Sequence, residues 1–561
     1  MTPPLVRKCQ VATLAVTLMF FGAPHVWAGS TVEISIDPFD NPGSQHMTEV
    51  EPHVFSFGST VVAAFQQGRY HDGGCSDIGF ATSLDNGVNW QHGSLPGLTI
   101  FVGGDRYLSV SDTAVAHNAA FGLWLIESLP VGGDAAIFVS RSADGLNWDF
   151  PITAASEGGA FFDKPWITCD NNESSPFFGN CYIEWDSVFE GLQILMITST
   201  DGGASWSDPI GTADAAGGLG GQPLVLPSGR VVVPYRGFGD VRSFISDDGG
   251  ASWSPSVEVS SSSEHEVAGG LRSPSLPSAA IDGDGTIYLA WHDCSFRPSC
   301  RANDVVISTS SDGLSWSSPA RVPIEDPSGP GDYFLPGLGA DRNTFAPGVS
   351  LALVYYHYPQ GNCSQATCQL IGGFVTSSDG GQTWSAPIDV TSPMAIDWLP
   401  DTSSGRMVGD YFGADFTDDG VPHPIFAGAA EPIGPSPVCG ASGVTCFESM
   451  FSTSVGSAER RRAEVATADD ARRAEETPEP NGLRIVAPSY SVNIGTVMQL
   501  RANGSSNQGA PISWSIEEGG AGGTVSEMGL YRAPFYPGVD HIVATNGLER
   551  ARIELRVFTV R

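Results

Sequence analysis

Six short segments of this chain share one pattern, in which serine, aspartate, glycine and tryptophan recur within seven or eight residues. Successive tryptophans lie 47 to 68 residues apart, and the segments are 83–90, 142–148, 199–206, 246–253, 310–316 and 377–384. The aspartate can accept backbone N–H groups and the glycine supplies a positive φ, so each segment predicts a hairpin turn. The tryptophan offers a large apolar face to a neighbouring unit. Self-similarity at this period predicts an array of repeated β-units.

These segments resemble Asp boxes, the repeat of the sialidase (neuraminidase) superfamily and of other Asp-box propellers. The resemblance covers roughly residues 80–390 directly and implies an all-β fold, a β-propeller. It also implies that each box lies in the turn between the third and fourth strands of a blade, away from the ligand-binding face. The box residues, including their aspartates, are therefore expected to be scaffold.

The number of blades follows from counting repeats. Six apolar runs predict second strands at 61–65, 122–126, 181–185, 231–235, 286–291 and 351–355. Runs at 409–416, 424–429 and 449–454 predict a seventh unit without a box, whose fourth strand would be residues 31–36. Such a strand would close the ring and remove the sheet edges. We predict seven blades; the alternative is six, as in the sialidase family, with one unit an insertion.

The two ends of the chain differ from the repeats. Residues 1–28 predict a secretory signal peptide, because Arg7 and Lys8 precede an apolar stretch and small residues stand before Gly29. The propeller is then expected at 29–456, and a linker rich in Glu, Arg and Ala at 457–482. Short alternating strands return at 483–561, where the segment 529–534 resembles a signature of bacterial immunoglobulin-like modules. This resemblance implies a small β-sandwich with a spacing or adhesion role.

Cysteine usage and charge both fit an exported protein. Eight cysteines form close pairs that predict disulfides: Cys169/Cys181, Cys294/Cys300, Cys363/Cys368 and Cys439/Cys446. No pair has the spacing of a zinc site, so we expect no metal and no cofactor, and Cys75 is left buried or as a free thiol. The net charge of −35 argues against nucleic acid and anionic membranes as partners. We expect a secreted monomer without membrane insertion, whose partner is an extracellular glycan or glycoprotein.

In a propeller the first strands line a central channel, so the starts of these strands are the candidate site. They supply Glu51, His53, Arg106, Tyr107, Asp163, Lys164, Trp166, Gln222, Arg272, Asp332, Tyr333, Asp410 and Tyr411. Charged and aromatic side chains suit a sugar, which offers hydroxyl edges and flat C–H faces. Asp163, Lys164 and Tyr333 are predicted to bind substrate on this ground. The alternative is that the ring residues bond to one another and serve only structure.

The resemblance to sialidases implies further roles. Those enzymes hold the substrate carboxylate with three arginines and use a tyrosine nucleophile, activated by glutamate, with an aspartate as acid and base. Matching segments place Arg69, Arg236 and Arg272 as substrate-binding residues, and Asp72 and Tyr411 as catalytic residues. The sequence departs from this pattern, because Gln67 and Gln222 replace the expected glutamates.

A first arginine is also missing, since Glu51, Pro52 and His53 stand where the family has its opening Arg-Ile-Pro. Two hypotheses therefore stay open. One is a secreted exo-glycosidase that acts on terminal acidic or neutral sugars. The other is a non-catalytic propeller that binds glycans or proteins, with its sandwich as spacer or anchor.

Overall fold

The computed structural model describes residues 31–453 and, beyond them, 484–486, 491–493, 497–503, 512–516, 524–526, 530–532, 538–545 and 550–558. The chain separates into two compact units, Met1–Ala458 and Glu459–Arg561. The predicted signal peptide (1–28) and linker (457–482) lie outside the described residues. The described residues form strands and single-turn 3-10 helices, with no α-helix among them, so the all-β prediction is confirmed. None of their helices has the length and apolar character that crossing a membrane requires.

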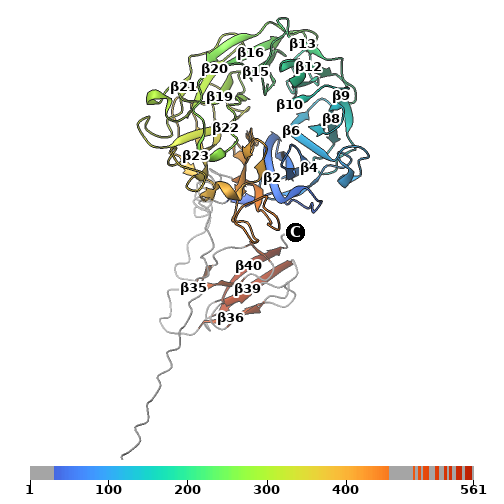
Figure 1. Ribbon diagram of the computed structural model, residues 1–561. Helices are drawn as coiled ribbons and strands as arrows, with labels where there is room; N and C mark the ends of the chain where they lie inside the picture. The colour runs from blue at the N-terminus through green and yellow to red at the C-terminus, as the bar shows by residue number, and fades with distance from the viewer. Residues whose placement is uncertain are drawn as a thin grey trace, which may run out of the picture. The chain divides into compact units, whose positions relative to one another are not determined.

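In the first unit, antiparallel pairing groups most strands into consecutive sets of four around a common centre (Figure 1); β26 (Met394–Ala395), which pairs with β24, and the pair β27 (Asp401–Thr402) and β28 (Gly405–Arg406) are additional. Sets one to three are β2 (Ser44–Phe57), β3 (Thr60–Tyr70), β4 (Cys75–Ser83), β5 (Gln91–Ser94); β6 (Ser109–Asn118), β7 (Leu123–Val131), β8 (Ala135–Ser142), β9 (Ile152–Glu157); and β10 (Phe162–Cys169), β11 (Cys181–Ser187), β12 (Gln193–Ser199), β13 (Ile210–Gly211). Sets four to six are β14 (Leu224–Val225), β15 (Val231–Arg236), β16 (Asp240–Ser246), β17 (Val257–Ser261); β18 (Ser278–Ile281), β19 (Ile287–Asp293), β20 (Asp304–Ser310), β21 (Ala320–Arg321); and β22 (Asp332–Ala340), β23 (Leu351–Tyr358), β24 (Gln369–Ser377), β25 (Ile388–Asp389).

The seventh set joins the two ends of this unit. It contains β29 (Gly413–Phe416), β30 (Pro422–Ala429), β31 (Glu448–Thr453) and, from the start of the described chain, β1 (Thr31–Glu33). β1 pairs with β31, Thr31 opposite Thr453, which is the place expected for residues 31–36. The grouping favours seven blades over six. The number stays a prediction, because single bridges from β2 to β31 and from β4 to β6 merge three sets into one sheet.

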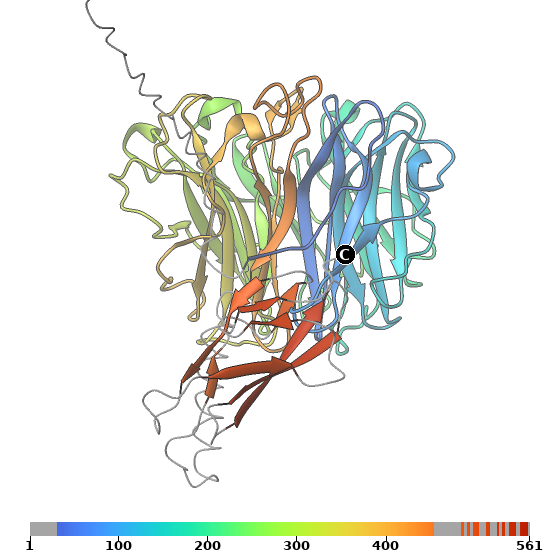
Figure 2. The same cartoon turned by 90° about the horizontal axis from the view of Figure 1, so that it is seen from below.

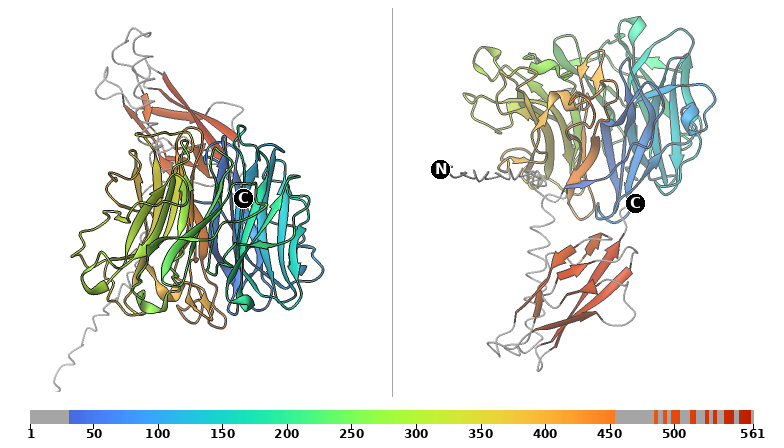
Figure 3. Two further views of the ribbon diagram at one scale, coloured as in Figure 1. Left: turned by 90° about the horizontal axis from the view of Figure 1, so that it is seen from above. Right: turned by 60° about the horizontal axis from the view of Figure 1, so that its bottom comes forward.

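The second strands form the interior of the sheets. β11 and β19 are buried along their whole length, and Trp185 and Trp291 are fully enclosed. Both faces of these strands are covered by neighbouring sheets, which explains why their sequences are continuous apolar runs. Seen edge on, the strands of the first unit run between its two faces (Figures 2 and 3). The start of each first strand therefore lies at one face, and the end of each third strand at the other.

The six Asp boxes form one hydrogen-bonded turn. In each, the serine hydroxyl donates to the aspartate at 2.8–3.1 Å and accepts the glycine N–H at 2.8–2.9 Å. The turns follow the third strands, as predicted. The box glycines also press on the preceding set: a Cβ on Gly203 would lie 2.6 Å from Leu125, and one on Gly313 would lie 2.4 Å from Val232. We call these six segments the box turns; each fixes its set against its neighbour.

The four predicted disulfides are present, and Cys75 is a buried free thiol. Each disulfide closes a short loop at a distance of 5 to 12 residues along the chain. Such short loops limit the freedom of the unfolded chain only locally. The prediction of local clips is therefore confirmed.

The second unit has its own strands and core. Its strands are β32 (Arg484–Val486), β33 (Ser491–Asn493), β34 (Val497–Gln499), β35 (Arg501–Asn503), β36 (Ser513–Ile516), β37 (Thr524–Val525), β38 (Leu530–Arg532), β39 (Gly538–Thr545) and β40 (Arg550–Phe558). They pair in three small sheets. Tyr531 is fully buried among them, and its hydroxyl donates to Asp540 at 2.7 Å. The immunoglobulin-like identity of 483–561 stays a prediction.

Candidate functional site

A cavity of about 650 Å³ opens where the first strands of the first three sets begin. It brings together five of the eight predicted site residues: Arg69, Asp72, Asp163, Lys164 and Arg272. Its wall also includes Glu51, Asp112 and Asp410, together with apolar side chains such as Leu219 and Leu271. The cavity therefore combines fixed charges with apolar surface. Among the residues that the structure describes, no group of histidine, cysteine and acidic side chains is arranged to hold a metal ion.

A recurring β-bulge turns side chains toward this cavity. The register of four first strands shifts, and one shift in each strand contains a residue with positive φ: Glu51 (+55°), Asp112 (+27°), Lys164 (+51°) and Leu335 (+52°). Bulges redirect side chains, and positive φ outside glycine persists only where the surroundings enforce it. Three of the four residues line the cavity, so the repeat delivers two carboxyl groups and an ammonium to one place.

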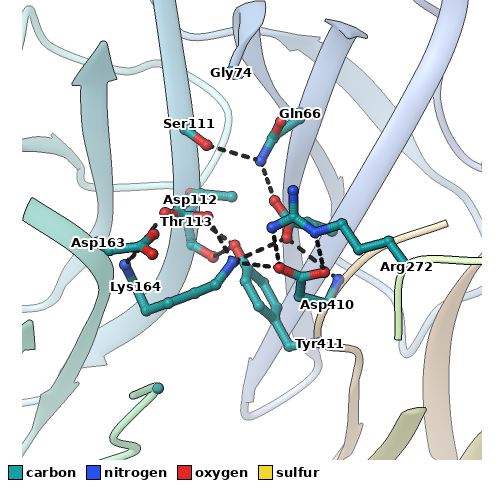
Figure 4. A network of polar contacts seen from close by, with 12 residues as sticks. Gln66, Gly74, Ser111, Asp112, Thr113, Asp163, Lys164, Arg272, Asp410 and Tyr411 are labelled. Carbon is teal, nitrogen blue, oxygen red and sulfur yellow. Dashed lines mark hydrogen bonds and ion pairs between the residues drawn. The ribbon is translucent and has the colours of Figure 1, made fainter. Parts of the chain in front are cut away.

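Lys164, the single lysine of residues 29–561, lies at the centre of an ionic network (Figure 4). Its Nζ lies 2.7 Å from Asp410, 3.3 Å from Glu51 and 3.4 Å from Asp112. All four side chains are at most 5% exposed. Burial lowers the pKa of Lys164, but the three carboxyl groups outweigh this effect and raise its pKa well above the usual range.

Arg272 completes this network from the opposite side. Its Nε donates to Oδ1 of Asp410 at 2.7 Å and its Nη2 donates to Oδ2, so the pair is bidentate. Burial alone would raise the pKa of Asp410, but Lys164 and Arg272 hold it well below its ordinary value. Arg272 keeps 24% of its side chain exposed. We call Glu51, Asp112, Lys164, Arg272 and Asp410 the central cluster.

The other two acids of the central cluster behave differently from Asp410. Burial raises the pKa of Glu51 and of Asp112, and the attraction of Lys164 only partly offsets this effect. Glu51 also accepts hydrogen bonds from the side chain of Gln66 and, at 3.2 Å, from the backbone N–H of Asp410. These two hydrogen bonds fix the position of the Glu51 carboxyl group in the cavity wall.

Arg69 and Asp72 lie on the wall formed by the first set. Arg69, near the end of β3, is 3% exposed and its Nη1 donates to the carbonyl of Gly74. Asp72 follows in the turn before β4; its side chain is 94% exposed and its Oδ1 lies 2.6 Å from Nδ1 of His71. Asp163 is half-buried and accepts the backbone N–H of Lys164 at 3.1 Å. Asp72 and Asp163 take no part in the described ion pairs of Lys164 and Arg272.

Tyr411 lies behind Lys164, whose Nζ is 5.5 Å from the centre of its ring. Its hydroxyl accepts the backbone N–H of Thr113 at 2.9 Å and donates to the carbonyl of the same residue at 3.3 Å. Burial raises the pKa of the phenol well above its usual value. A neutral phenol held by backbone bonds supports the wall of the cavity, and Tyr411 is not among the residues that line it.

The remaining two predicted residues lie outside the cavity. Arg236 ends β15 and pairs with Glu264, both about one-third exposed. Tyr333 is 6% exposed and stacks on His357, with ring centres 5.4 Å apart. The guanidinium carbon of Arg297 lies over the Tyr333 ring, 5.7 Å from its centre. Of the three arginines assigned to substrate binding, the cavity wall contains Arg69 and Arg272, and Arg236 is absent from it.

Sequence reasoning missed Asp112 altogether. For the second set we took Arg106 and Tyr107 as the start of the first strand, whereas β6 begins at Ser109 and its bulge residue is Asp112. A signal exists in other sets, because Pro52, Pro165 and Pro336 directly follow Glu51, Lys164 and Leu335. In the second set this position is Thr113, so the signal is lost there.

No curated protein matches the sequence. Similar solved structures include the NanB sialidase from Streptococcus pneumoniae (14% identical, 76% of this chain and 71% of that chain, TM-score 0.39) and the intramolecular trans-sialidase from Ruminococcus gnavus (13%, 74% and 96%, 0.38). Another is the GH93 α-L-arabinofuranosidase of Fusarium graminearum (12%, 76% and 98%, 0.40). Similarities this weak carry no argument about activity. Residues 244–255 match the BNR/Asp-box repeat family. Together with the six turns that share the serine, aspartate and glycine hydrogen bonds, this match identifies the chain as one that carries BNR/Asp-box repeats.

Proposed function

We propose that the central cavity binds a sugar residue of an extracellular glycan, and that this sugar carries no carboxylate. The cavity has the size of a small-ligand site and combines polar and apolar lining. Asp163 and Asp72 offer acceptors for sugar hydroxyls, and Leu219 and Leu271 offer apolar surface for C–H faces. The Asp boxes add a resemblance to propellers that act on glycans.

One observation carries the choice of an uncharged sugar: two of the three cations of the cavity, Lys164 and Arg272, are already engaged with carboxylates. Arg272 is held bidentately by Asp410, and Lys164 contacts three acids. A ligand carboxylate would have to compete with these buried partners. Removing one partner from a buried ion pair is strongly unfavourable. Arg272, which was expected to hold a carboxylate, is therefore not free to do so, and Arg69 is only 3% exposed and donates to the carbonyl of Gly74.

The overall charge of the lining supports the same conclusion. Five carboxyl groups (Glu51, Asp72, Asp112, Asp163 and Asp410) accompany three cations (Arg69, Lys164 and Arg272). A sixth, Asp134, has its own partner in Arg106. If the raised pKa values kept Glu51 and Asp112 protonated, the remaining charges would only balance. In neither case is the cavity positive, so an anionic sugar gains nothing from its field.

Glycoside hydrolysis is the second candidate function. Asp72 and Asp163 line one cavity and are not bound to its cations, so they are the carboxyl groups that could act as acid and base. Tyr411 is less suited to be the nucleophile, because its hydroxyl bonds to the backbone of Thr113 and burial raises its pKa. Binding without hydrolysis therefore needs fewer assumptions.

The test is a glycan array and titration calorimetry with the full chain, comparing neutral and sialylated glycans. We expect neutral glycans to bind and terminal sialic acid to give no gain. Asp163→Asn should weaken binding about tenfold by removing an acceptor. Asp208→Asn, an exposed acid in the third box loop, is the matched control and should bind normally. Binding that depends on sialic acid would overturn the proposal, and turnover of aryl glycosides would establish the second candidate.

A further inference from the structure

We infer that a ridge of three exposed phenylalanines beside the cavity, Phe161, Phe189 and Phe238, binds further sugar units of the same glycan chain by stacking. This inference rests on the proposed function of the cavity. The side chains are 46%, 73% and 75% exposed, respectively. Exposed large aromatic residues that gather on neighbouring loops mark interaction sites more often than single ones do. We call these three residues the aromatic ridge.

The first two rings of the ridge lie together. Phe161 precedes β10 and Phe189 lies in the turn after β11, with ring centres 5.8 Å apart and planes inclined by 34°. The backbone N–H of Val188 donates to the carbonyl of Phe161 at 2.8 Å, which fixes one loop to the other. The two rings therefore form a surface whose position is fixed by the hydrogen bond between their loops. This surface is present without a bound ligand.

The third ring extends this surface along the next set. The N–H of Gly218 donates to Leu192 at 2.9 Å, and the N–H of Leu219 donates to Arg236 at 2.8 Å, so three loops are bonded in a row. Phe238 follows Arg236 in the turn before β16, and a Cβ on Gly217 would lie 3.4 Å from its ring. The ring of Phe238 therefore lies within ordinary van der Waals range of the Gly217 position.

The aromatic ridge is continuous with the cavity. Phe161, whose loop is bonded to Val188, and Leu219, in the middle one of the three bonded loops, also line the cavity wall. A chain whose terminal unit sits at Asp163 can therefore extend over Phe161 toward Phe189, whose ring centre lies 5.8 Å from that of Phe161. This continuity selects a linear glycan as the occupant over an unrelated partner.

The chemistry of the ridge also suits sugar units. Flat aromatic faces pack against the C–H faces of a pyranose ring, while hydroxyl groups at its edge need polar neighbours. Such neighbours are present: Glu190 follows Phe189, and the Arg236–Glu264 pair lies two residues from Phe238. Arg236, predicted to bind substrate, thus belongs beside the ridge and not in the cavity.

The test compares short and long ligands. The probes are neutral oligosaccharides graded in length on an array, followed by calorimetry with the best binder and with its terminal monosaccharide. Phe189→Ala with Phe238→Ala should weaken oligosaccharide binding at least about tenfold, since each lost stacking contact is worth about a factor of three to ten. Monosaccharide binding should not change. Phe345→Ala, which removes another exposed phenylalanine (55%) in the loop after β22, is the control and should bind normally.

The outcomes separate the two proposals. If Asp163→Asn weakens binding but the ridge variants do not, the ridge inference is overturned and the cavity stands. If the ridge variants abolish binding while Asp163→Asn has no effect, the ridge stands and the cavity proposal fails. Equal melting temperatures of all variants exclude loss of fold, as expected for side chains this exposed. Equal loss with monosaccharide and oligosaccharide would also contradict the ridge.

Discussion

The box turns and the central cluster both come from repetition, and they use it in opposite ways. At the box turns, six copies of one hydrogen-bonded turn keep the same serine, aspartate and glycine. At the centre, a recurring bulge carries a different residue each time: Glu51, Asp112, Lys164 and Leu335. In the box turns the side chains hold the backbone in its conformation through hydrogen bonds, so the same residues recur. At the bulges the backbone only positions a side chain, so the residue can differ from one set to the next.

The two regions also treat charge differently. The box aspartates are exposed and receive hydrogen bonds from their own turn, which hold the pKa of Asp144 at about 2. The central acids are buried, and burial raises the pKa of Glu51 and Asp112. The scaffold charges are thus satisfied locally, whereas those of the centre depend on residues from several sets.

The largest effect should come from breaking the central cluster. Lys164→Met leaves Glu51, Asp112 and Asp410 buried without their shared ammonium, so we expect a loss of about 3–5 kcal/mol in the free energy of unfolding. Urea denaturation followed by tryptophan fluorescence measures it. The surface pair Arg230–Asp247 provides the control, since Arg230→Met should cost less than about 1 kcal/mol. Equal losses would remove the distinction between centre and surface.

The box turns should respond mainly through their tryptophans. Trp253 is 4% exposed and packs against Tyr182 and Phe244, so Trp253→Ala should cost about 3–4 kcal/mol. Trp206 occupies the same place in the third box but is half-buried, so Trp206→Ala should cost less. Thermal unfolding checks the order, and calorimetry should find ligand binding unchanged. A stable variant that has lost binding would contradict the scaffold role.

A pH profile should distinguish buried acids from box aspartates. Burial raises the pKa of Glu49 from 4.5 to about 8, although Ser35 and Gln67 donate hydrogen bonds to it. Because the folded state holds this proton more tightly, its contribution to stability is complete below about pH 4.5 and is lost as pH rises to about 8. Glu49→Gln should flatten this decline, because the amide has no proton to lose over the range. If the melting temperatures of the parent and of Glu49→Gln fell equally between about pH 4.5 and pH 8, this role of Glu49 would be contradicted.

The smallest effect should have the opposite sign. The pKa of Asp144 is lowered by its turn from 3.8 to about 2, so its contribution is present above pH 3.8 and is lost on acidification toward pH 2. Asp144→Asn should therefore lower the melting temperature slightly at pH 7, and the difference from the parent should shrink near pH 2. The measurement is a melting series in acid. A difference that persists there would mean that the turn needs the side chain's shape and not its charge.

Much of the fold could be predicted from the sequence, because its signals are local. The box turns need only residues within eight positions of one another, and the cysteine pairs close loops of 5 to 12 residues. The second strands can be recognised in the sequence as apolar runs, because both of their faces are buried. Even the pairing of β1 with β31 followed from counting, since the last unit lacked a strand.

The site was predicted only in part. Position alone placed Asp163, Lys164 and Arg272 at the centre, and they line the cavity. It also placed Tyr333 there, although this ring packs against Arg297 and His357 and does not line the cavity. The start of a strand does not reveal its bulge, and a shift of one residue moves a side chain to the other face. The place of Asp112 in the site was therefore not predicted, because the bulge of β6 could not be located from the sequence.

The sequence by itself determined the repeat, the turns, the disulfides and the all-β class, since each depends on neighbours along the chain. Only the tertiary structure decided which charges meet. Glu51, Asp112, Lys164, Arg272 and Asp410 come from five different sets or the segments that precede them. Their pKa values, and the engagement of both cations, follow from burial and distances that no local pattern contains.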